Sequence, residues 1–313
     1  MNTPLRVSGP PSLISALPYL LGFQPTDSVI CVLLQSDAIS GCIRYELSDD
    51  TEQVFDLIES TLVNHKYDAL VVVVVTENIA SDLNRLLTKF NLAKIDLLDF
   101  LITDFQVYRS ALCVDLSCCP PTGTDLTAAQ RDTVAAELVL SGHVAATSRA
   151  ELLERLTPRP IDFNQEVADL LDGEKLSGSE LLKRLTEIHR TAILETEMIE
   201  IVIALSDPEI RNDLEYTLFE SIDGELTNPD QLRIAAENLR QCAVIAPRQL
   251  AAMPYGLLAF CFWNLGEWIL ADASVAQALK LDDMNSPARL TKRLIMQGVD
   301  PVTARRQIFP SAA

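Results

Sequence analysis

The sequence predicts an α/β N-terminal domain, a mixed sheet flanked by helices, followed by an all-α C-terminal domain. Apolar runs of strand length alternate with helically spaced apolar residues up to about residue 108. From Thr127 onward the signals are almost wholly helical. Between the two parts, the prolines of Thr157-Pro-Arg-Pro160 exclude a helix and favour an extended link. We therefore expect an α/β domain at residues 1–157 and an all-α domain at residues 161–313.

The N-terminal part alternates strand and helix signals in chain order. Residues 12–21 are apolar and broken by Pro18, with Gly22 in a helix-ending position. The strands are predicted at residues 29–34, 40–47 and 70–75, with one or two more within 95–108. Helical spacing predicts helices at 51–64 and 79–90. The strand at 70–75 is apolar throughout, so we expect it to be buried on both faces.

The C-terminal part shows repeated helix-start signals. In a capping box, a Ser or Thr hydroxyl accepts a hydrogen bond from the amide three residues on, and the Glu or Gln at that position accepts one from the amide of the Ser or Thr. Four pairs have this spacing: Thr127 with Gln130, Ser148 with Glu151, Ser177 with Glu180 and Ser206 with Glu209. Pro208 then falls in the first turn of its helix, where its missing N–H costs nothing. The predicted helices lie near residues 162–172, 178–205, 208–220, 229–245, 248–264, 268–281 and 287–297.

One helix pair, at about residues 249–282, resembles a tetratricopeptide repeat unit. The two helices meet at Gly266, and small alanines stand where the helices must touch. Tyr255 replaces the usual Trp, Asp283 replaces the usual closing Pro, and no second copy follows at the repeat period. Two interpretations stay open: a lone helical hairpin that closes the core, or a docking surface for a protein partner.

Composition sets limits on the function. The formal net charge is −19, spread over both halves, which argues against duplex nucleic acid as a partner because that contact needs a basic face. The longest apolar run covers residues 69–75, far short of the roughly 20 residues that a membrane span needs. Seven cysteines are an odd count, and four of them sit in apolar strand-like or helical runs. This usage is typical of a reducing compartment, and we expect a cytoplasmic protein without nucleic-acid or membrane contacts.

The most informative segment holds Cys113, Cys118 and Cys119, three of the seven cysteines within seven residues, followed by Pro120-Pro121 and Gly123. As metal ligands they would supply three of the four that zinc needs, and the spacing matches no zinc signature. Asp115 is in reach as a fourth ligand, and His143 could approach only if the following helix folds back. The neighbouring Cys118 and Cys119 could instead form a strained, reducible disulfide. Partly buried thiols that only pack the sheet edge are the third interpretation.

Signals for familiar catalysis are weak. No Gly-x-Ser-x-Gly elbow, phosphate-binding glycine loop or His-Glu-x-x-His motif occurs in the sequence. Asp27 and Ser28 precede the first strand, and Arg44 and Glu46 alternate on the second. Polar groups at a sheet end can bind a small ligand, although such residues more often serve the turn or a solvated face.

Several segments resemble an actinobacterial family, the domain-of-unknown-function 4192 family. They are Leu17-Pro-Tyr-Leu-Leu-Gly-Phe with its continuation to Val29, Ile43-Arg-Tyr-Glu-Leu47, and the stretch from Arg109 through Cys118-Cys-Pro-Pro-Thr-Gly123. Arg109 and Asp115 lie in the last segment and become ligand-binding candidates. Ser110 and Asp125 depart from the family pattern, which has an aromatic residue and a proline there. The resemblance implies a cytoplasmic bacterial protein and supplies no activity.

From these observations we expect a non-catalytic binding, scaffold or regulatory protein, with a protein partner on the C-terminal helices. The alternative is a metal- or thiol-dependent enzyme or redox sensor centred on Cys113, Cys118 and Cys119, with zinc as the metal. A third hypothesis is a small-ligand receptor near Asp27 and Arg44.

Overall fold

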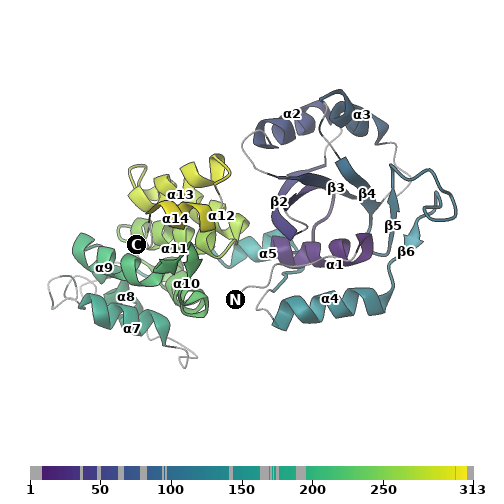
Figure 1. The fold of residues 1–313 in the computed structure, drawn as a ribbon. Helices are drawn as coiled ribbons and strands as arrows, with labels where there is room; N and C mark the ends of the chain where they lie inside the picture. The colour runs from purple at the N-terminus through teal and green to yellow at the C-terminus, as the bar shows by residue number, and fades with distance from the viewer. Residues whose placement is uncertain are drawn as a thin grey trace. The chain divides into compact units, whose positions relative to one another are not determined.

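The computed structural model describes residues 9–35, 38–47, 51–62, 67–77, 83–93, 95, 97–140, 144–162, 169, 171, 173, 176–187, 195–299 and 301–308 (Figure 1). The chain forms two compact units, Met1–Glu151 and Leu152–Ala313. The first is a mixed sheet with helices and the second is a run of helices, which confirms the predicted fold class. The division into domains that fold independently stays a prediction.

The sheet of the first unit has six strands in the order β2-β1-β3-β4-β5-β6. Only β3 and β4 pair in parallel; the other neighbours are antiparallel. The predicted 95–108 segment is two strands joined by a tight turn. The strands are β1 (Ser28–Gln35), β2 (Ala38–Glu46), β3 (Ala69–Val75), β4 (Leu97–Thr103), β5 (Val107–Ser110) and β6 (Thr124–Asp125).

Helices cover both faces of this sheet (Figure 1). Helices α2 (Thr51–Leu62) and α3 (Asn84–Leu92) lie on one face, and α1 (Pro10–Leu21) and α4 (Ala128–Leu140) lie on the other. Leu70 to Val75 of β3 are all buried, as predicted for a strand with two covered faces.

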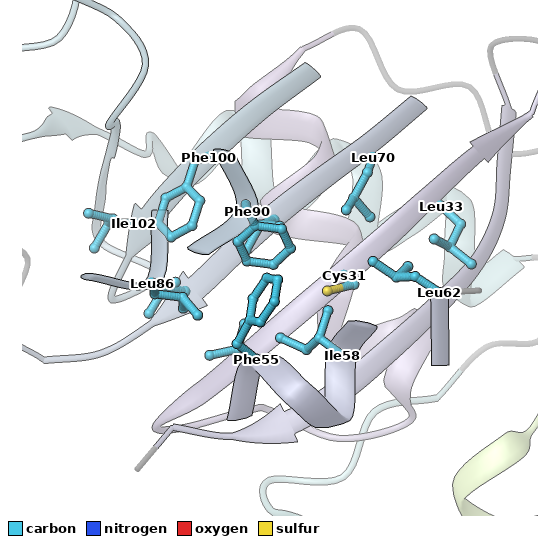
Figure 2. Close-up of a cluster of buried hydrophobic side chains, with 13 residues drawn as sticks. Cys31, Leu33, Phe55, Ile58, Leu62, Leu70, Leu86, Phe90, Phe100 and Ile102 are labelled. Atoms are coloured by element: carbon cyan, nitrogen blue, oxygen red, sulfur yellow. The ribbon is translucent and has the colours of Figure 1, made fainter. Parts of the chain in front are cut away.

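The core under α2 and α3 is built around three aromatic rings (Figure 2). Phe55 of α2 and Phe90 of α3 meet edge to face at 5.2 Å between ring centroids. Phe90 then meets Phe100 of β4 at 6.3 Å. Such contacts add about 0.5–1.5 kcal/mol each to the burial of the rings. The rings therefore tie both helices to β4, the strand that pairs with β5 ahead of the cysteine-rich loop.

The second unit is helical with one small hairpin that the sequence analysis did not predict. Strands β7 (Ser221–Ile222) and β8 (Glu225–Leu226) pair across Asp223 and Gly224, both with positive φ. The predicted helix at 178–205 is two helices in the described residues. The helices are α7 (Gly178–Thr186), α8 (Glu195–Ala204), α9 (Pro208–Leu218), α10 (Pro229–Ile245), α11 (Ala252–Asn264), α12 (Trp268–Leu281), α13 (Ser286–Met296) and α14 (Pro301–Ile308). None of the helices in the described part of the chain is long and apolar enough to cross a bilayer.

Helices α11 and α12 form the predicted helical pair, with Gly266 at φ 78° between them. Ala259, Ala271 and Ala278 are fully buried where the helices pack. A docking surface on this unit would therefore have to use other residues. The likeness to a tetratricopeptide repeat and the protein partner both stay predictions.

Of the four predicted capping boxes, the structure confirms the hydroxyl bond of two, those of Ser148 and Ser177, and shows that the one at Ser206 is wrong. Ser148 accepts the amide of Glu151, and Ser177 accepts the amide of Glu180. At α9 the cap is Asp207, whose carboxylate accepts the amide of Glu209, while the Ser206 hydroxyl donates to Val202 O. The Asp207 carboxylate caps the helix in place of the Ser206 hydroxyl because its negative charge is stabilised by the positive end of the helix dipole.

A buried arginine fastens α14 to the rest of the second unit. Arg305 is 5% exposed; its Nε donates to Gly224 O at 2.7 Å and its Nη1 to Asn264 Oδ1 at 2.8 Å.

We expect Arg305→Met to lower the free energy of unfolding by about 3 kcal/mol, because two buried oxygens lose a charged donor. Urea unfolding followed by circular dichroism measures this. Arg306→Met is the matched control: Arg306 is exposed, and its loss should cost under about 1 kcal/mol. Equal losses for the two variants would contradict this role for Arg305.

Candidate metal centre

The loop at residues 111–123 connects β5 to β6 at the edge of the sheet opposite β2. Its ends are held together because Tyr108 of β5 pairs with Thr124 of β6. The Thr124 hydroxyl also donates to Cys118 O at 3.1 Å. The loop therefore projects from one edge of the sheet, and these hydrogen bonds hold its two ends in place.

A turn around Asp115 folds the loop back on itself. The main-chain oxygen of Asp115 accepts the amides of Cys118 at 3.1 Å and Cys119 at 2.8 Å. Its carboxylate Oδ1 accepts the Ser117 amide at 2.8 Å and the Ser117 hydroxyl at 2.7 Å. These bonds, from the Ser117 hydroxyl first and then its amide, lower the pKa of Asp115. Asp115 therefore places Cys118 and Cys119 beside Cys113.

Ser110 anchors the other end of the loop. Its hydroxyl donates to Asp99 Oδ1 of β4 at 2.6 Å and accepts the Cys113 amide at 3.1 Å. Here the hydroxyl takes a structural role by tying the loop to the neighbouring strand.

The three sulfur atoms converge at this point. The Sγ atoms of Cys113, Cys118 and Cys119 all lie within 4.8 Å of one another, and those of Cys118 and Cys119 are 4.0 Å apart. Four sulfurs at the usual 2.3 Å from a zinc ion are separated by about 3.8 Å in a tetrahedron. Each pair of sulfurs would therefore have to close by about 1 Å at most to share a metal ion.

The environment of the thiols differs from one to the next. Cys118 is exposed, whereas Cys113 and Cys119 are half-buried. Burial and the sulfurs of Cys113 and Cys118 raise the pKa of Cys119 to about 11, against an opposing hydrogen bond from the Ser110 amide. Tyr108 lies beside the thiols of Cys118 and Cys119, and burial, together with the charges on these two groups, raises the pKa of Tyr108. Burial thus favours the protonated form of the Cys119 thiol.

No fourth ligand completes the set within the described residues. The Asp115 carboxylate is turned into its own loop and is not among the clustered ligand atoms. His143, the other predicted ligand, lies outside the described residues. The described residues offer three sulfur ligands here, which leaves one coordination position open to a further ligand.

Gly123 shapes the base of the loop. Its φ is 85°, and a Cβ there would lie 3.1 Å from Val107 Cβ and 3.3 Å from Tyr108 O. We expect Gly123→Ala to distort the β5–β6 junction and to weaken metal binding by about 10-fold, as changes around metal ligands do. Metal titration measures this. Gly41→Ala is the control, because its Cβ would meet only one side-chain atom, at 3.7 Å. Unchanged binding by Gly123→Ala would contradict the role of this turn.

Four of the other candidates, Asp27, Ser28, Arg44 and Glu46, lie together on or beside β1 and β2, at the far side of the sheet. Asp27 immediately precedes β1, and Ser28, where β1 begins, is paired with Glu46 of β2. Arg44 Nε donates to Ser28 Oγ at 2.9 Å, its Nη1 lies 3.2 Å from Glu46 Oε1, and its guanidinium lies 5.9 Å from the Phe23 ring centroid. These contacts orient Arg44 and join the two strands.

Arg109 belongs instead to β5, opposite Ile102 of β4, in the part of the sheet that carries the cysteine loop. The predicted site residues therefore form two groups, separated by β3 and β4. A role in ligand binding stays a prediction for all of these polar residues.

The structure also shows features that the sequence analysis missed. Ser110 and Tyr108 join the cysteine site through sheet register, for which the sequence gives no local signal. A cavity of about 670 Å³ in the first unit is lined in part by Pro18 and Tyr19 of α1, by Gln24, and by Phe105 with its φ of 67°.

Comparison with known protein families decides the family. The family described as Domain of unknown function (DUF4192) matches residues 10–302. The chain belongs to the DUF4192 family. The match spans both units, so the sheet and the helices are parts of one DUF4192 protein. Comparisons with curated proteins and with solved structures gave no match.

Proposed function

We propose that this DUF4192 protein is a non-catalytic regulatory protein that binds one thiophilic metal ion, Zn²⁺ in the first place, through Cys113, Cys118 and Cys119. The observation that carries the proposal is the convergence of the three Sγ atoms to within 4.8 Å. Thiolates prefer Zn²⁺ and Cu⁺ to the harder cations Mg²⁺ and Ca²⁺. The regulatory part is supported by the absence of familiar catalytic motifs from the sequence.

The half-exposed position suits a site that gains and loses its ion. A closed structural zinc site has four protein ligands, whereas three ligands leave a position for exchange. All seven cysteines are free thiols, which supports a location in the reducing cytoplasm. In that compartment the ion occupancy of the loop would change with the supply of metal.

A titration with Co²⁺ followed by Zn²⁺ tests the proposal. Reduced protein should develop thiolate-to-cobalt charge-transfer absorption that saturates at one equivalent and disappears when Zn²⁺ is added. A variant with all three loop cysteines changed to serine should show none. Cys42→Ala is the control, because Cys42 is half-buried in β2, away from the loop. Equal absorption by wild type and the triple variant would contradict the proposal.

A further inference from the structure

We propose that a hydroperoxide such as hydrogen peroxide releases the metal ion by joining Cys113 and Cys118 in a disulfide, with Cys119 left as a free thiol. This inference rests on the proposed function, because the ion released is the one bound by the three sulfurs. It turns the site into a redox-controlled metal switch, and the geometry of the loop points to the cysteine pair that reacts.

The adjacent pair Cys118 and Cys119 is the less suitable one, although its sulfurs are 4.0 Å apart. Consecutive Cα atoms are about 3.8 Å apart across a trans peptide. Disulfides usually join Cα atoms separated by about 4.4–6.8 Å, and shorter separations store strain. Cys113 is separated from Cys118 by the Asp115 turn, so this pair avoids the restriction.

Exposure selects Cys118 as the thiol that meets the oxidant. It is the exposed member of the cluster, whereas Cys113 and Cys119 are half-buried. Its sulfur lies within 4.8 Å of the Cys113 sulfur, which is therefore in place to attack the oxidised Cys118. Cys119 is half-buried, so the oxidant reaches its sulfur less readily than the exposed sulfur of Cys118.

The two apolar residues between Cys113 and Cys118 are not part of the core. Val114 is 94% exposed and Leu116 is 69% exposed, so neither contributes to the core. Drawing the Cys113 and Cys118 sulfurs together should therefore shift this exposed loop and leave the sheet unchanged. Disulfide formation by these two cysteines needs no opening of the first unit.

One hydrogen peroxide oxidises the two thiolates to a disulfide in two steps. The Cys118 thiolate attacks one peroxide oxygen, the O–O bond breaks, and Cys118 sulfenic acid forms while the departing hydroxide takes a proton. The Cys113 thiolate then attacks the Cys118 sulfur and expels the hydroxyl group, which leaves as water after taking a second proton. Two thiolates, one hydrogen peroxide and two protons thus give one disulfide and two waters. The disulfide no longer supplies thiolate ligands, so the ion departs and Cys119 takes a proton from solvent.

Treatment of zinc-loaded full-length protein with hydrogen peroxide tests this inference. A chromogenic chelator reports the zinc released, and peptide mapping after alkylation reports the cysteines. We expect one zinc released for each Cys113–Cys118 disulfide, with Cys119 alkylated, and reloading after treatment with dithiothreitol. In metal-free Cys113→Ser, Cys118 should remain as a sulfenic acid that dimedone captures.

The outcomes separate this inference from the proposed function. Zinc that loads but is released without a disulfide, or with a Cys118–Cys119 disulfide, would overturn the inference alone. Protein that never loads zinc would overturn the proposed function and the release step with it. Peroxide treatment of the metal-free wild type keeps the pairing testable in that case, because a Cys113–Cys118 disulfide would still support the assigned pair.

Discussion

Changing Cys119 to serine is expected to weaken zinc binding by at least about 100-fold, because a ligand itself is lost. Loss of a residue that only hydrogen-bonds to a ligand costs less, roughly 10–100-fold. The Cys119 sulfur lies within 4.8 Å of the sulfurs of both other cysteines, and its loss leaves two ligands. A serine hydroxyl is a poor replacement because it stays protonated at neutral pH. Competition with a chelator of known affinity, at constant pH and under reducing conditions, measures the change.

Asp115→Asn is the matched control in the same loop. The asparagine oxygen can still accept the two bonds from Ser117, so the turn should survive. Because the carboxylate is not among the clustered ligand atoms, we expect zinc affinity to stay within a few-fold of wild type. If Asp115→Asn reduced the affinity as much as Cys119→Ser does, a carboxylate would have to be a ligand. If the Cys119→Ser variant bound zinc like wild type, the three-sulfur site itself would be wrong.

Gly256→Ala is expected to destabilise the second unit by about 3–5 kcal/mol, an exceptional loss for the addition of one methyl group. A Cβ at this position of α11 would lie 2.0 Å from Asn285 Oδ1. Asn285 is 1% exposed; its Nδ2 donates to Ala252 O at 3.0 Å, and its Oδ1 accepts the Ala288 amide at 3.1 Å. The new methyl would displace the side chain that caps α13 and joins it to α11, and leave buried polar groups without partners. Thermal and urea unfolding measure the loss.

Gly266→Ala separates this steric clash from backbone strain. Gly266 has a φ of 78°, and a Cβ there would meet nothing within 4 Å. Its replacement should cost only about 1–2 kcal/mol, the penalty for a left-handed residue with a side chain. A cost for Gly256→Ala no larger than that for Gly266→Ala would contradict the packing described for Asn285.

The strands and helices of the first unit could be predicted because their signals are local. The apolar run at 70–75 became β3 with both faces covered, and the 95–108 segment became β4 and β5. The small hairpin of the second unit was missed because two-residue strands carry no periodicity. Its Asp223-Gly224 turn was nevertheless a visible hairpin signal. The burial of Arg305 was not predictable, because its acceptors are distant in sequence.

The residues of the candidate site could be predicted from the sequence, but the arrangement of those residues in space could not. The sequence showed that Cys113, Cys118 and Cys119 are neighbours along the chain. Their convergence depends on the Asp115 turn and on the register that brings Ser110 beside Asp99. Asp115 itself proved to shape the loop, since its carboxylate accepts bonds from Ser117. Such contacts depend on the three-dimensional path of the chain.

Native mass spectrometry of the reduced, zinc-loaded full-length protein tests the central claim most directly. We predict that the folded wild type carries the mass of one zinc ion, that the ion is lost on denaturation, and that the variant with all three loop cysteines changed to serine carries none. A folded wild type without zinc, or a triple variant that retains it, would contradict the assignment of these three cysteines as a metal site.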